Sequence, residues 1–190
     1  MNIPNMLTLM RIALIPVFVA LFYVPAGWAY KACAIVFAIA AFTDWLDGWL
    51  ARRLEQVSPL GAFLDPVADK LMVATALVLL VQRDPQPWIA VPVLVIIGRE
   101  ITISALREWM AELGERAQVA VSMVGKFKTA AQMAAIFFMI YQAPLGSIAT
   151  YTVGVVLLYI ATILTLWSMV VYVQASWSSL TGEQGEREED

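Results

Sequence analysis

The sequence predicts an all-α, polytopic membrane protein with six transmembrane helices. Two observations lead to this fold class. The 190 residues are 61% hydrophobic and 14% charged, with a mean hydropathy of +0.76, whereas soluble domains are closer to half apolar. The apolar residues also gather in long stretches, and a helix needs about 20 of them to cross the hydrocarbon core of a bilayer.

Six stretches meet this requirement, and helix-breaking residues or charged segments separate them. The first stretch ends at Pro25 and Gly27, and charged connections follow the second and fourth stretches. Prolines divide the third from the fourth, and Pro144 with Gly146 divides the fifth from the sixth. A cleavable signal peptide is an alternative for the first stretch, but its N-terminal region lacks clustered positive charge. The predicted spans are residues 6–24, 28–50, 67–82, 87–106, 127–143 and 147–175.

Lys and Arg are distributed unequally between the connections. Nearly all of them lie near the termini or beside the two charged connections, and only Lys31 and Arg83 fall on the opposite side. The positive-inside rule therefore predicts that both termini and both charged connections face the cytoplasm. We expect a transmembrane domain over residues 1–177 and an acidic, disordered tail over residues 178–190.

Composition excludes several kinds of site. The chain has no histidine, so a Ser-His couple, a histidine base and a histidine-bearing zinc site are excluded. A net charge of -3 argues against nucleic acid as a partner. The single cysteine, Cys33, cannot form a disulfide within the chain.

Acidic residues gather where the second and third predicted helices meet, in "FTDWLDGWLARRLEQVSPLGAFLDPVADK", residues 42–70. Helical spacing places five residues on one face of the second helix: Asp44, Asp47, Gly48, Ala51 and Arg52. Asp65 and Asp69 share a face at the start of the third helix. The connection between the helices carries Pro59 and Gly61, so the two pairs of carboxylates can converge.

Four carboxylates close together would repel one another and lose hydration, so a cation must neutralise them. Oxygen ligands without His or Cys suit Mg²⁺ or Mn²⁺, and two such ions could bind a diphosphate. Gly48 and Ala51 leave a small-residue surface for close approach, and Arg52 could pair with phosphate. The alternative is that the aspartates cap helix ends and pair with Arg52, Arg53 and Lys70.

The acidic stretch resembles the signature of the CDP-alcohol phosphotransferase family at eight spaced positions: Asp44, Asp47, Gly48, Ala51, Arg52, Gly61, Asp65 and Asp69. The similarity extends to "NIPNMLTLMRI", "REITISALREWMAELG" and "GKFKTAAQM", and so covers nearly the whole chain except the tail. The resemblance implies a six-helix enzyme in the bacterial inner membrane, with its active site on the cytoplasmic side and a homodimer as its assembly.

The implied reaction moves the phosphatidyl group of CDP-diacylglycerol to sn-glycerol 3-phosphate and releases CMP. The resemblance makes Asp44, Asp47 and Asp65 metal ligands and Asp69 both ligand and base. It assigns nucleotide contacts to Gly48, Ala51, Arg52 and Ser58, with Asn5 and Thr8 on the face of the first helix that carries Arg11. Interface capping is an alternative role for Asn5 and Thr8.

An anionic acceptor needs cations of its own. The candidates are Arg99, Arg107, Lys126 and Lys128. Positive-inside anchoring could account for each of the last three. Arg99 lies deep in the apolar stretch "VLVIIGREITI", where phosphate binding is favoured over simple neutralisation by Glu100 or an aspartate.

Three other functions remain open at this point. A different acceptor alcohol would fit the same signature. An intramembrane prenyltransferase also holds Mg²⁺ and a diphosphate with aspartates, but such enzymes use two widely separated motifs. A cation transporter would place acidic residues in a bundle, yet the carboxylates here crowd one end of it.

Overall fold

The computed structural model describes residues 3–54, 59–112, 123–144, 146 and 149–175. Within them the fold contains helices and no strand, which confirms the all-α prediction. The six helices are α1 (Ile3–Phe22), α2 (Ala29–Leu54), α3 (Pro59–Arg83), α4 (Pro87–Glu112), α5 (Met123–Tyr141) and α6 (Thr150–Ala175).

Four of these helices are long and apolar enough to cross a membrane. They contain the stretches Asn5–Phe22, Ala29–Leu50, Pro87–Glu112 and Thr150–Gln174. The apolar part of α5 is shorter, Phe127–Tyr141, and α3 carries Asp65, Asp69 and Lys70 in its first half. The chain is therefore a multi-pass membrane protein, and among the described helices α3 and α5 are not candidate spans by length and composition.

The third helix begins well before the predicted start at residue 67. It starts at Pro59, which the sequence analysis placed between helices, and α4 likewise starts at Pro87. Proline suits the first position of a helix because its missing N–H would have no partner there. Asp65 and Asp69 consequently lie inside α3, in its second and third turns. The predicted span therefore covered only the later part of this helix.

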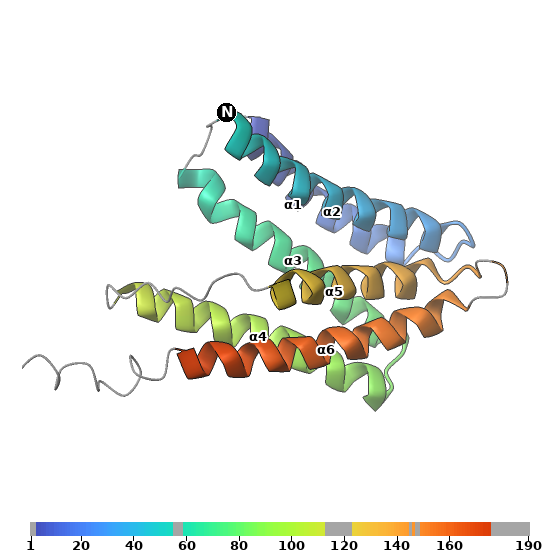
Figure 1. The fold of residues 1–190 in the computed structure, drawn as a ribbon. Helices are drawn as coiled ribbons and strands as arrows, with labels where there is room; N and C mark the ends of the chain where they lie inside the picture. The colour runs from blue at the N-terminus through green and yellow to red at the C-terminus, as the bar shows by residue number, and fades with distance from the viewer. Residues whose placement is uncertain (1–2, 55–58, 113–122, 145, 147–148, 176–190) are drawn as a thin grey trace, which may run out of the picture.

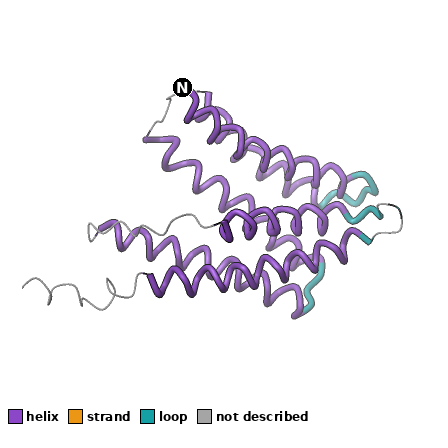
Figure 2. The backbone as a smooth tube through the Cα atoms, in the orientation of Figure 1, coloured by secondary structure: helices purple, strands orange, loops and turns teal. Residues whose placement is uncertain are grey.

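The helices form a bundle, and its two ends carry different connections between the helices (Figure 1). The first helix packs on α2 and α3, while α5 contacts α2, α3 and α6, and α4 contacts α3 and α6. At one end, called here the aspartate end, α2 finishes and α3 begins. The opposite end carries the connections that follow α1, α3 and α5, as the tube in Figure 2 shows.

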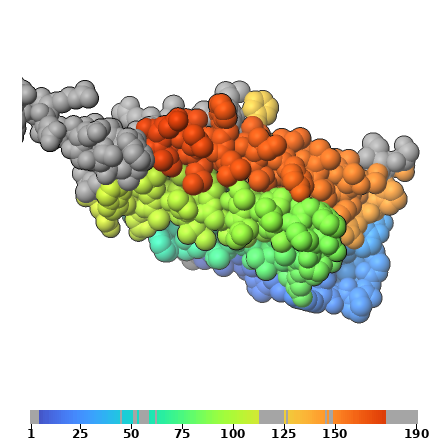
Figure 3. Space-filling model, turned by 90° about the horizontal axis from the view of Figure 1, so that it is seen from below, coloured from blue at the N-terminus to red at the C-terminus, as the bar shows by residue number. Residues whose placement is uncertain are grey.

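Apolar side chains fill the centre of the bundle. Phe18, Phe37, Leu77, Ile136 and Leu158 are almost completely buried there, and they come from five helices. Close packing of such side chains holds membrane helices together, and here it holds α1, α2 and α3 against one another. Two helices that contribute to this core, α4 and α6, lie side by side along one face of the molecule (Figure 3).

Close packing of α5 and α6 depends on Gly154. A Cβ atom at this position would lie 2.6 Å from Cγ of Met139 and 2.8 Å from the backbone nitrogen of Met139. Real Cβ atoms do not approach backbone atoms this closely, so only glycine allows the two helices to lie at this separation. The sequence analysis did not single out this residue.

Candidate active site

A buried arginine joins the first two helices at the aspartate end. Nη1 of Arg11 lies 2.6 Å from Oδ1 of Asp44, and Nη2 forms a second ion pair with Oδ2 of Asp47. The side chains of Arg11 and Asp47 are 1% and 3% exposed, whereas that of Asp44 is 41% exposed. One guanidinium thus bridges two carboxylates that share a helix face, as the spacing predicted.

The third helix joins the same group through Asp65. The hydroxyl of Thr8 donates a hydrogen bond of 2.5 Å to Oδ1 of Asp65, and Thr8 is fully buried. Asn5, one turn earlier on α1, is also buried. The face of α1 that was predicted from three-residue spacing therefore lies against the aspartates of both neighbouring helices.

Electrostatic interactions connect the four aspartates. Asp47 interacts with Asp44 and Asp65, and Asp69 interacts with Asp44 and with Arg11. Among the residues that the structure describes, no three acidic side chains are placed to share one metal ion. Asp44 and Asp47 are instead paired with Arg11, and Asp65 accepts a hydrogen bond from Thr8.

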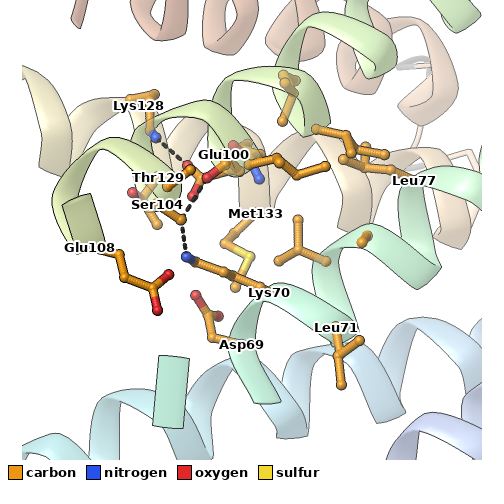
Figure 4. A pocket seen from close by; sticks show the side chains of 17 residues that line it. Asp69, Lys70, Leu71, Leu77, Glu100, Ser104, Glu108, Lys128, Thr129 and Met133 are labelled. Atoms are coloured by element: carbon orange, nitrogen blue, oxygen red, sulfur yellow. Dashed lines mark hydrogen bonds and ion pairs between the residues drawn. The ribbon is translucent and has the colours of Figure 1, made fainter. Parts of the chain in front are cut away.

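A cavity of about 490 Å³ adjoins Asp69, between α3, α4 and α5. Its walls are apolar on the side toward the bundle centre, where Leu77, Ile96 and Met133 lie. The charged ends of Asp69, Lys70 and Glu108 point toward one another at its polar side (Figure 4). The cavity could therefore hold a molecule that is charged at one end.

A network of hydrogen bonds lines the polar side of this cavity. Lys70 donates to the hydroxyl of Ser104, and that hydroxyl donates to the backbone oxygen of Glu100 at 2.6 Å. Nζ of Lys128 lies 3.0 Å from Oε1 of Glu100. Two lysines from different helices thus reach the space beside Asp69, and one of them already has a carboxylate partner.

The other predicted acceptor cations lie elsewhere. Nη1 of Arg99 pairs with Glu100 at 2.9 Å, and its Nη2 donates to Ser168 of α6 at 3.1 Å. The Arg107 guanidinium lies 5.4 Å from the centre of the Tyr172 ring of α6. Neither arginine lines the cavity. The structure therefore brings Lys128 to the cavity, and it places Arg99 and Arg107 against α6.

Comparison with known proteins identifies the family of this chain. The model of the family described as CDP-alcohol phosphatidyltransferase matches residues 1–167. The chain belongs to this family. Its curated relatives include a CDP-diacylglycerol--glycerol-3-phosphate 3-phosphatidyltransferase of Pseudomonas fluorescens, which is 56% identical over 181 residues, covering 95% of this chain and 92% of the relative. Proteins of the same name from Yersinia pestis (strain Pestoides F) and Pectobacterium atrosepticum are each 54% identical, covering 95% and 92% of this chain and 97% and 94% of the relative.

In this CDP-alcohol phosphatidyltransferase family member, part of the predicted nucleotide site is not described. Ser58 lies outside the described residues, as do residues 178–190 of the predicted tail. The side chains of Ala51, Arg52 and Lys126 are also outside the described part of the structure. Gly48 lies on α2 one residue after Asp47, on the face that meets α1. The predicted nucleotide contacts stay predictions.

Sequence reasoning missed several residues of the site in this family member. Lys70 and Ser104 line the cavity, and Lys70 was considered only as a partner of the aspartates. Glu100 was considered only as a partner of Arg99, yet it also binds Lys128. Ser104 lies four residues after Glu100, on the same helix face. The signal that could have identified Ser104 was its four-residue spacing from Glu100, an acidic residue in an apolar stretch.

Proposed function

We propose that this chain transfers the phosphatidyl group of CDP-diacylglycerol to sn-glycerol 3-phosphate, forming phosphatidylglycerophosphate and CMP. The observation that carries the proposal is the position of Asp69. This carboxylate lies beside the aspartates of α2 and lines a cavity that also contains Lys70 and Lys128. The printed names of the relatives, at 54–56% identity, support the same reaction.

The aspartates fit a pair of divalent cations by their chemistry. All four donors are carboxylates, the ligands that Mg²⁺ and Mn²⁺ prefer. The Arg11 guanidinium, which bridges Asp44 and Asp47, marks a place where positive charge is stabilised. Asp44, Asp47, Asp65 and Asp69 would hold two such ions, which when bound supply positive charge to neutralise the substrate diphosphate.

The side chains of this protein perform the remaining steps. Asp69 accepts the proton of the glycerol 3-phosphate hydroxyl. The hydroxyl oxygen forms a bond to the phosphorus that carries diacylglycerol, while the bond between that phosphorus and the bridging oxygen breaks. CMP leaves with the electron pair. The nucleotide is contacted by Gly48, Ala51, Arg52, Ser58, Asn5 and Thr8.

Cations beside the cavity hold the acceptor phosphate. Lys70 and Lys128 line the cavity with Asp69, so a phosphate between them would leave a glycerol hydroxyl near the base. Arg99 acts on this site through Glu100, which it shares with Lys128. Arg107 and Lys126 add positive charge at the same end of the bundle.

The proposal includes a location and an assembly. All six helices cross the bacterial inner membrane, because α3 and α5 are shielded by contacts with their neighbours in the bundle. Both termini and the active site face the cytoplasm, since Lys and Arg gather at the aspartate end. The protein acts as a homodimer, as the family resemblance implies.

The test is a product assay on the purified protein. We would incubate it with CDP-diacylglycerol and, in parallel, glycerol 3-phosphate, inositol phosphate or serine, and measure CMP release and the lipid product. We expect CMP and phosphatidylglycerophosphate only with glycerol 3-phosphate, and no product when EDTA removes divalent cations. CMP release with another alcohol and none with glycerol 3-phosphate would refute the proposed acceptor.

A further inference from the structure

A second arginine lies partly buried at the opposite end of the bundle. Arg83 is the last residue of α3, and 14 residues separate it from Asp69, which corresponds to about 21 Å along a helix. Its guanidinium carbon lies 4.2 Å from the centre of the Phe22 ring. This contact places a charged group against the end of α1, far from the aspartates and outside the proposed reaction.

Among the described residues, no group accepts a hydrogen bond from the Arg83 side chain. A guanidinium offers five N–H donors, yet Arg83 takes part in none of the side-chain hydrogen bonds or ion pairs found among the described residues, and its Nη1 is buried without a partner. Asp84 is the only acidic residue in the three connections at this end, and it accepts a hydrogen bond from Tyr151. A buried charged donor without a partner is costly, so an anion from outside would stabilise it.

Arg83 also lines a cavity of about 360 Å³. The other walls include the connection between α1 and α2, from Val24 to Gly27, together with Tyr30 and Gln142. Gln142 has a φ angle of 51°, a left-handed conformation that is strained for a residue with a side chain. Three separate segments thus line the cavity together with the arginine, and one of them is held in a strained conformation.

We propose that this cavity binds a phosphate group through Arg83. The planar guanidinium matches phosphate oxygens with paired, charge-assisted hydrogen bonds. The cavity lies at a helix end, where the polar headgroups of a bilayer meet the protein, and basic pockets between membrane helices bind such headgroups. A phospholipid headgroup and free phosphate share this chemistry, and the experiment separates them.

The test measures lipid binding to the full-length protein in neutral detergent by native mass spectrometry. The probes are phosphatidylglycerol, inorganic phosphate and a galactosyl diacylglycerol, which has comparable acyl chains and no phosphate. Arg83→Met removes the guanidinium and keeps an apolar side chain on Phe22. Lys31→Met is the matched control, because Lys31 is an exposed cation at the same end.

We expect Arg83→Met to weaken phosphatidylglycerol binding about tenfold or more, with no such change in Lys31→Met and none for the galactolipid. An Arg83-dependent signal from inorganic phosphate alone would assign the site to free phosphate. Equal binding by Arg83→Met and the wild type, or an equal loss in Lys31→Met, would overturn the proposal. If Arg83→Met does not fold, Gln142→Ala replaces it, with a smaller loss expected and unchanged binding again contradicting the site.

Discussion

Arg11 and Asp47 form an ion pair that is almost completely buried between α1 and α2. The same guanidinium binds Asp44, so it bridges two of the four carboxylates that we propose as metal ligands. A divalent cation and this arginine would compete for the same oxygens. Arg11 is therefore an internal counter-ion of these carboxylates, and a bound metal ion would have to draw Asp44 and Asp47 away from it.

Replacing Arg11 by Gln should have two opposite effects. Without metal, the buried Asp47 loses its partner, which should destabilise the fold by about 3–5 kcal/mol. Mn²⁺ affinity should rise at least about tenfold, because a competing positive charge is gone. Thermal unfolding with and without Mn²⁺, and electron paramagnetic resonance of free Mn²⁺, measure the two effects.

The control for this experiment is Arg53→Gln. Arg53 is exposed and lies over the Trp49 ring, 4.9 Å from its centre, so neither stability nor Mn²⁺ affinity should change. Weaker Mn²⁺ binding in Arg11→Gln would mean that Arg11 supports the metal site rather than competing with it.

Asp69→Asn should abolish turnover while CDP-diacylglycerol still binds. The amide cannot accept the proton of the attacking hydroxyl, and loss of a general base costs about 10²–10⁴ in rate. CMP release and equilibrium binding of the nucleotide lipid report the two properties. Turnover near the wild-type level would remove Asp69 as the base.

Lys128→Gln should raise the KM for glycerol 3-phosphate about tenfold or more, because a charge-assisted contact to phosphate is lost. The KM for CDP-diacylglycerol should change much less. Arg53→Gln is the control, since Arg53 is exposed, lies over Trp49 and does not line the cavity. Equal changes in both KM values for Lys128→Gln would argue against an acceptor site at the cavity.

Gly154→Ala should destabilise the protein by about 1–3 kcal/mol, because its Cβ would overlap the Met139 backbone. Gly98→Ala serves as the comparison, since a Cβ at that position of α4 has no atom within 4 Å. That substitution should be neutral or slightly stabilising. Thermal unfolding of both variants measures the difference, and equal melting temperatures would contradict the close packing of α5 and α6.

The sequence was sufficient to predict six helices and the two aspartate pairs, because hydropathy and helical spacing are local properties of the chain. It was insufficient to predict the partners of the charged groups. Arg99 lies in an apolar stretch, and its distance from the aspartates depends on which helix it faces. It faces Ser168 of α6, sixty-nine residues away, and no local pattern encodes that contact.

The start of α3 is a second feature that local sequence patterns did not predict correctly. The predicted span started at residue 67, whereas the helix extends back to Pro59 through a stretch that contains Gly61, Asp65 and Pro66. The bridge between Arg11, Asp44 and Asp47 was likewise missed. Spacing placed Arg11 on the correct face of α1, but the neighbour of that face is decided by packing of the whole bundle.

The most direct test of the metal-dependent mechanism is anomalous scattering at the manganese edge from crystals grown with Mn²⁺. We predict two peaks among the carboxylates of Asp44, Asp47, Asp65 and Asp69, with Arg11 no longer bound to both Asp44 and Asp47. The absence of any peak between these four side chains, with Arg11 still bridging Asp44 and Asp47, would contradict the account.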